Sequence, residues 1–220
     1  MSKKRTTRDP KNRVKTAKGR TVASTRWLER QLNDPYVAKA KMDGYRSRAA
    51  YKIKEIDEKI GLFKKGQMVV DLGAAPGGWS QVAAEKGCDV VGLDLLEIDP
   101  MPDITFLQMD FMDDDAPDQL IEAMGGRKAD IVLSDMAQNT TGHKNTDHLR
   151  IMALVETAYY FAKDVLNEDG VFIAKVFQGG AQNTLLAEMK KDFKTTKHIK
   201  PPASRSDSSE TYLVATGFKG

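Results

Sequence analysis

After Gly66 the sequence alternates short apolar runs with longer amphipathic segments, and this alternation restricts the possible fold more than any other feature. Strands are predicted over residues 67–72, 88–95, 104–110, 129–135, 170–177, 194–199 and 211–218. Helices are predicted over residues 78–86, 115–124, 147–166 and 180–192. Strands that alternate with helices predict an α/β fold, with a doubly wound, mostly parallel seven-stranded sheet and helices on both faces.

The last two predicted strands are connected differently from the others. Between Ile199 and Thr211 the chain reads KPPASRSDSSE, which is too polar and proline-rich for a crossover helix. Parallel neighbours need such a crossover, so the last strand is expected to run antiparallel to its predecessor. Glu210 would then lie at the sheet edge where the parallel strands end, and open α/β sheets bind ligands at that edge.

The region before the sheet predicts three helices. The first lies around STRWLERQL, and the second follows an Asn33-Asp34-Pro35 turn and ends near Gly44. The third runs from Ser47 to Gly61, and the Ser47 hydroxyl is expected to cap its first free amides.

Positive charge is concentrated at the start of the chain. The net charge is +3, yet residues 1–20 alone contain nine basic residues and one acid. A segment this basic is expected to be disordered on its own, which divides the chain into a basic arm, 1–20, and a single domain, 21–220. The arm is either a solubilising tail or, as the rest of the sequence favours, a contact for nucleic-acid phosphates.

Composition excludes several classes of protein. Apolar residues make up 40% of the chain, but none of the apolar runs approaches the roughly 18 residues of a membrane span. The charged N-terminus is not that of a secretory signal. Cys88 is the single cysteine, so neither an internal disulfide nor a cysteine-based metal cage can form. We expect a cytoplasmic protein with no membrane contact and no metal site.

The segment DLGAAPGGWS, residues 71–80, links a buried strand to a helix through three glycines. A phosphate-binding P-loop needs Lys and then Ser or Thr after its last glycine, but Trp79 follows Gly78. The glycine spacing also differs from the G-x-G-x-x-G pattern of dinucleotide sites. The loop therefore predicts a nucleoside ligand without a pyrophosphate.

Four successive strands end in an acid, namely Asp71, Asp94, Asp110 and Asp135. Asp94 is placed to accept hydrogen bonds from ribose hydroxyls, and Asp110 from an adenine amine. Each acid alone could equally cap a helix or solvate a loop. Together at one sheet edge they predict one crevice, and S-adenosylmethionine is the ligand that fits it.

Two lysines and a glutamate are hard to explain as scaffold. Lys175 interrupts the apolar strand GVFIAKVF, Lys52 borders the apolar stripe of its helix, and Glu210 begins the last strand. Singly, the lysines could extend their amines into water and Glu210 could be an edge carboxylate. With Asp135 they form two cations and two anions that converge on the ligand edge.

At these residues the sequence resembles the FtsJ-type ribosomal RNA 2′-O-ribose methyltransferases. The likeness covers Tyr45 to Phe218 through SRAAYKIKEI, DLGAAPGGWSQ, GLDLLEIDP, FLQMDF, DIVLSDMAQNTTG, FIAKVFQGG and SSETYLVATG. It implies a Rossmann-like S-adenosylmethionine-dependent methyltransferase fold. It also implies a catalytic tetrad at Lys52, Asp135, Lys175 and Glu210.

The cofactor contacts that the resemblance implies are Gly77, Trp79, Asp94, Asp110 and Asp135. One departure is Gln138, where the family pattern has proline. The implied substrate is a uridine of large-subunit ribosomal RNA, presented in the assembled subunit. We expect the enzyme to be a monomer. The basic arm and the catalytic edge, with Lys39, Lys41, Arg46 and Arg48 between them, would contact the RNA. A 2′-O-methyltransferase for transfer RNA or an mRNA cap, and a nonenzymatic RNA-binding module, are the alternatives.

Lys175 is the residue expected to act on the reacting 2′-hydroxyl. A ribose 2′-hydroxyl is a poor nucleophile, so the enzyme must align it and handle its proton. Lys175 would deprotonate the hydroxyl if neutral, or stabilise the developing alkoxide if charged. The residue pattern leaves both roles open.

Overall fold

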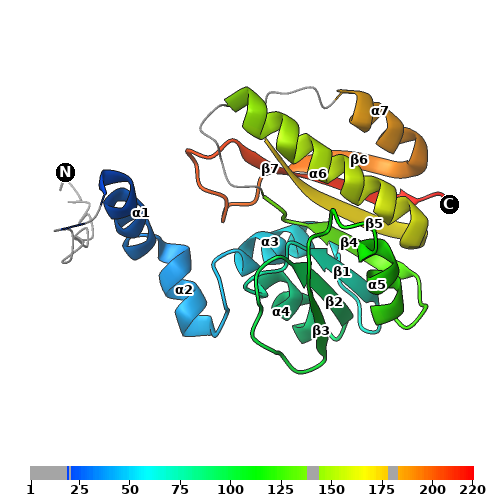
Figure 1. The fold of residues 1–220 in the computed structure, drawn as a ribbon, viewed down its shortest axis with the longest axis horizontal. Helices are drawn as coiled ribbons and strands as arrows, with labels where there is room; N and C mark the ends of the chain where they lie inside the picture. The colour runs from blue at the N-terminus through cyan, green and yellow to red at the C-terminus, as the bar shows by residue number, and fades with distance from the viewer. Residues whose placement is uncertain (1–18, 20, 138–143, 178–182) are drawn as a thin grey trace, which may run out of the picture.

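The computed structural model describes residue 19 and residues 21–137, 144–177 and 183–220 (Figure 1). The predicted basic arm falls outside these residues except for Gly19, and so does Gln138. Residues 180–182, at the start of one predicted helix, also lie outside them.

The described residues form a seven-stranded sheet in the order β3-β2-β1-β4-β5-β7-β6. The strands are β1 (Met68–Leu72), β2 (Asp89–Asp94), β3 (Ile104–Gln108), β4 (Ala129–Ser134), β5 (Leu166–Phe177), β6 (Phe193–Ile199) and β7 (Glu210–Phe218). Strands β1 to β5 pair in parallel, whereas β7 lies antiparallel between β5 and β6. The predicted α/β sheet and its antiparallel last strand are confirmed.

Helices cover both faces of the sheet, as predicted (Figure 1). They are α1 (Val22–Leu32), α2 (Pro35–Asp43), α3 (Ala50–Ile60), α4 (Gly78–Glu85), α5 (Ala116–Ala123), α6 (Lys144–Val165) and α7 (Asn183–Asp192). One buried cluster joins α5, α6 and α7 to the sheet, and a second joins α3 and α4 to the other face. Successive strand side chains point to opposite faces, so Val70 packs in the first cluster and Val69 in the second.

Two local predictions were wrong. Ser47 does not cap α3, which begins at Ala50 and has no side-chain cap. The Ser47 hydroxyl instead packs against Gly78, where an added Cβ would lie 2.5 Å from Ser47 Oγ. Strand β5 begins at Leu166 rather than Gly170, because Leu166 already pairs with Ala129 of β4; the register then shifts between Ala129 and Ile131. Asp169, with φ of 64°, lies in that irregular stretch.

Helices α1 and α2 lie at one end of the molecule, beside the connection from β6 to β7 (Figure 1). The Asp34 side chain caps α2 by accepting a hydrogen bond from Tyr36 N at 3.0 Å, and Pro35 occupies the first turn. Helix α2 ends at Gly44, whose φ of 78° suits a residue without a side chain. None of the helices in the described part of the chain is long and apolar enough to cross a membrane.

Candidate active site

The carboxyl ends of β2 and β3 border a cavity of about 130 Å³. Asp94 and Asp110 both line it, together with Gly73 and Met136. Two of the four predicted acids therefore do share one crevice. The other two differ from them, because Asp71 is fully buried and Asp135 turns towards the lysines.

The acids of the cavity also hold the surrounding loops. Asp94 accepts hydrogen bonds from the amides of Ala75 and Leu96, both at 2.9 Å. Asp110 accepts one from the amide of Met112, also at 2.9 Å. A carboxylate has about four lone-pair sites, so each side chain can still accept from a ligand.

The loop after β1 is shaped by two glycines. A Cβ on Gly73 would lie 2.8 Å from backbone atoms of Met136, and Gly73 has φ of 79°. Gly77, with φ of 100°, precedes the first residue of α4. Gly73 lines the cavity, and the lack of a side chain there lets the backbone pass close to Met136.

Arg46 fixes the same loop from outside. Its guanidinium donates to the carbonyls of Asp99 at 2.5 Å, Pro100 at 2.9 Å and Pro76 at 3.3 Å. Arg46 thereby ties the loop after β1 to the connection between β2 and β3. The sequence predicts Arg46 as part of an RNA-facing surface, but in the structure its donors bind the protein's own backbone.

Trp79 lies beneath the loop rather than in the cavity. Its indole nitrogen donates to Ala49 O at 2.9 Å, and its ring packs against Tyr212 with 5.4 Å between ring centroids. The side chain belongs to the core between α3, α4 and the sheet. A ligand contact at this position would therefore come from the Trp79 backbone, which lies in the first turn of α4.

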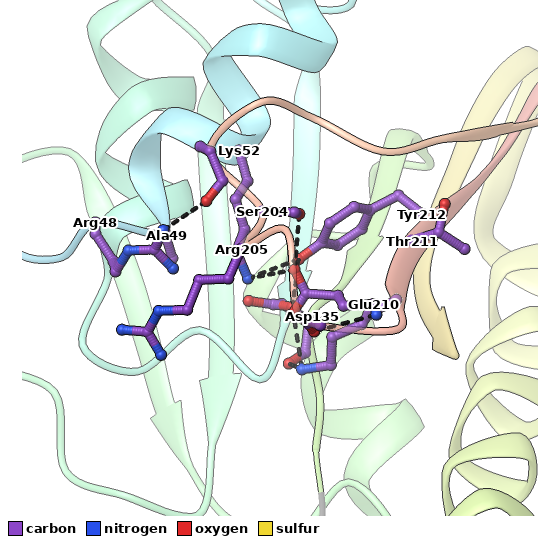
Figure 2. Close-up of polar contacts among 12 residues, drawn as sticks. Arg48, Ala49, Lys52, Asp135, Ser204, Arg205, Glu210, Thr211 and Tyr212 are labelled. Atoms are coloured by element: carbon purple, nitrogen blue, oxygen red, sulfur yellow. Dashed lines mark hydrogen bonds and ion pairs between the residues drawn. The ribbon is translucent and has the colours of Figure 1, made fainter. Parts of the chain in front are cut away.

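The four residues predicted as a tetrad do converge, and they form two ion pairs. Figure 2 labels three of them, Lys52, Asp135 and Glu210. Lys52 Nζ lies 2.8 Å from Glu210 Oε1, and Lys175 Nζ lies 3.1 Å from Asp135 Oδ1. Lys175 also donates to the Asp135 carbonyl at 2.6 Å. Both lysines are 8% exposed, so their positions are set by these contacts rather than by water.

Tyr212 joins the two ion pairs, and the sequence did not identify it. Its hydroxyl oxygen accepts from Lys52 Nζ at 3.0 Å and lies 3.1 Å from Asp135 Oδ1 and 3.2 Å from Glu210 Oε1. Burial first, and the charge of Asp135 next, raise the pKa of the Tyr212 hydroxyl well above its usual value. The hydroxyl therefore stays protonated and can donate to one carboxylate at a time.

Asp71 is a buried acid below the site. Its Oδ2 accepts from Ser80 Oγ at 2.6 Å, whereas Oδ1 has no hydrogen-bond partner among the described residues. Burial raises the pKa of Asp71 from 3.8 to about 7; the Ser80 hydrogen bond opposes this rise and Asp135 adds to it. Asp71 is thus a structural acid that is partly protonated near neutral pH.

The geometry shows a cavity beside two pairs of lysine and carboxylate side chains, and the sequence comparison identifies the family. The family model of FtsJ-like methyltransferases matches residues 45–218. The chain belongs to this family. As a member of the FtsJ-like methyltransferases it is an enzyme, and the match covers the whole sheet and the tetrad.

Named relatives of this FtsJ-like chain agree with the match. The Ribosomal RNA large subunit methyltransferase E of Xanthobacter autotrophicus is 59% identical over 96% of this chain and 85% of its own length. The protein of the same name from Paramagnetospirillum magneticum is 61% identical over 94% of this chain and 88% of its own. A solved candidate ribosomal RNA methyltransferase from Plasmodium falciparum, 34% identical, covers 80% of this chain and all of its own, with a TM-score of 0.72.

Proposed function

We propose that this protein transfers a methyl group from S-adenosylmethionine to the ribose 2′-hydroxyl of a uridine in large-subunit ribosomal RNA. The observation that carries the proposal is the pair of buried ion pairs, Lys52 with Glu210 and Lys175 with Asp135, joined by Tyr212 beside the ligand cavity. The names of its relatives support the RNA class. The enzyme would act as a cytoplasmic monomer on the assembled subunit.

The cavity fits part of such a cofactor. Small-molecule sites usually measure about 300–1,000 Å³, so a cavity of about 130 Å³ would enclose only part of the cofactor, and the rest would lie outside it. Asp94 would accept from the ribose hydroxyls and Asp110 from the adenine amine. Gly77 and the Trp79 backbone would contact the cofactor at the amino end of α4, and Asp135 would lie between cofactor and RNA.

The tetrad would align the acceptor and handle its proton. When bound, the cofactor supplies an activated methyl carbon whose bond to sulfur breaks as the bond to oxygen forms. Lys175 would hold the 2′-oxygen in line with that carbon, while the Lys52–Glu210 pair and Tyr212 fix the position of Asp135 and Lys175. The hydroxyl proton would pass to Lys175 if its amine is neutral, and otherwise to Asp135 or water.

The direct test of this function is mapping of ribose methylation. Purified protein and labelled cofactor are incubated with one of three substrates in separate reactions: large ribosomal subunits, transfer RNA or capped RNA. We expect one 2′-O-methyluridine in the ribosomal RNA of the subunits. Methylation of transfer RNA alone, or of the cap alone, would identify that RNA as the substrate instead. If none of the three is methylated, the proposed function is wrong.

Asp94→Ala is expected to weaken S-adenosylmethionine binding by about 1.5–3 kcal/mol, because it removes hydrogen bonds to a charged acceptor. Calorimetry on the folded variant measures the loss. Asp113→Ala is the matched control, since Asp113 is an exposed acid that follows Asp110 by three residues. If the parent and Asp94→Ala proteins bind the cofactor with equal affinity, Asp94 does not contact the cofactor.

Residues 1–20 are proposed to contact RNA phosphates. Deleting them should weaken RNA binding and flatten its dependence on salt, because fewer counterions are released, while cofactor affinity stays unchanged. Filter binding at several salt concentrations measures both quantities. If the RNA affinity and its salt dependence are unchanged, the segment is a solubilising tail instead.

A further inference from the structure

A groove separate from the cofactor cavity lies between the amino-terminal helices and the connection from β6 to β7. Its volume is about 1010 Å³. Helix α1 contributes Arg26 and Arg30, and the connection contributes Arg205. Arg26 and Arg30 are four residues apart on α1, so they lie on one face of it, and both are exposed. Neither forms an ion pair with another described residue.

Asp34 organises the arginines at the base of the groove. This carboxylate, whose side chain is 7% exposed, lies 2.9 Å from Arg48 Nε and 3.1 Å from Arg205 Nη2. Arg48 Nη2 also donates to the Ala203 carbonyl at 2.6 Å. The connection from β6 to β7 is thereby fixed to α2 and α3. Arg205 uses Nε and Nη2 on Asp34, which leaves other N–H groups of its five for a ligand.

The groove adjoins the catalytic residues. Ser204, on its wall, donates to Glu210 Oε1 at 2.9 Å, and Glu210 pairs with Lys52. Arg48 precedes Lys52 by four residues at the start of α3. Figure 2 places Arg48 and Arg205 on one side of the cluster formed by Lys52, Glu210 and Tyr212. A polymer whose reacting nucleotide lies at the cluster can therefore continue into the groove.

We infer that this groove binds the sugar-phosphate backbone of the RNA strand next to the target nucleotide, through Arg26, Arg30 and Arg205. The inference rests on the proposed function only in taking RNA as the ligand. Guanidinium groups bind phosphate oxygens in pairs of hydrogen bonds. Glu29 and Asp207 also line the groove, so recognition depends on these individual arginines rather than on a uniformly positive surface.

The test compares Arg26→Ala/Arg30→Ala with a matched double variant, Arg127→Ala/Lys194→Ala. The control residues are exposed cations at the opposite sheet edge, paired with Asp89 and Asp169. The probe is a labelled single-stranded oligoribonucleotide of about 10 nucleotides, within the usual span of such sites. Affinity is measured by fluorescence anisotropy at several salt concentrations, and cofactor affinity is measured on the same samples.

The α1 double variant is expected to bind this RNA about tenfold more weakly. Its slope of log affinity against log salt should fall by about 1.4, because each lost phosphate contact to a single strand is worth about 0.7. The control variant should change affinity by less than twofold, and cofactor binding should be unchanged in both. If both variants weaken binding equally, or the slope is unchanged, the groove does not bind RNA.

Two measurements separate this inference from the proposed function. If the parent protein methylates ribosomal subunits but the α1 double variant keeps the parent affinity for RNA, the function stands and the groove inference is overturned. A loss of activity on subunits without any loss of affinity for the oligoribonucleotide would also overturn it, since the groove would then dock a ribosomal protein.

Discussion

Replacing Lys175 by methionine is expected to slow methyl transfer by about 10²–10⁴-fold, the usual contribution of a positioned proton-transfer group. Loss of alignment of the 2′-oxygen would add to this deficit. Methionine keeps an unbranched side chain in β5, where Lys175 is 8% exposed, so it preserves packing better than alanine. Cofactor binding should remain, because Asp94, Asp110 and Gly73 are untouched.

Single-turnover methylation of ribosomal subunits measures the rate, and calorimetry measures cofactor affinity on the same folded samples. Lys175→Arg should not restore the rate, since a guanidinium is larger and does not release its proton at accessible pH. Lys163→Met is the matched control, because Lys163 also pairs with an acid, Asp192, but lies on α6. A Lys175→Met rate within a few-fold of the parent would make Lys175 structural.

The sheet could be predicted because its determinants are local in the sequence. Short apolar runs give the strands, and the absence of a helix between Ile199 and Thr211 gives the antiparallel last strand. The carboxyl ends of parallel strands meet at one edge, so Asp94 and Asp110 could be assigned to one cavity before any coordinates. Asp135, Lys175 and Glu210 were expected at the same edge, whereas Lys52 lies on α3 and was assigned to the tetrad from the resemblance to the FtsJ-type family.

The features that could not be predicted depend on distant contacts. Tyr212 looks like an ordinary core residue of TYLVATGF, yet its pairing opposite Lys175 brings its hydroxyl between two ion pairs. Its place two residues after Glu210, on the same strand face, was the signal available. Asp34 looks like a helix cap, and it is one, but it also pairs with Arg48 and with Arg205, which is 171 residues away.

The stability of the protein is expected to depend on pH through Asp71. Its pKa is about 7 in the folded protein and 3.8 when unperturbed, so the folded state holds a proton that the unfolded state releases between those values. Stability from this group is therefore fully present below pH 3.8 and is lost as the pH rises to about 7. A shift of about three pKa units corresponds to about 4 kcal/mol.

Asp71→Asn should remove this dependence, because the amide cannot ionise while its oxygen can still accept from Ser80 Oγ. The free energy of urea unfolding is measured for both proteins between pH 4 and pH 8, and the parent should lose about 4 kcal/mol relative to the variant over that range. Taking the difference cancels the titration of all other groups.

Ser80→Ala should raise the pKa of Asp71 further. Without the Ser80 hydrogen bond, which favours the charged form, the loss of stability should continue to higher pH. A parent-to-variant difference that is constant with pH would mean that Asp71 is ionised in the folded protein despite its burial, and that a partner for its Oδ1 supplies the missing stabilisation.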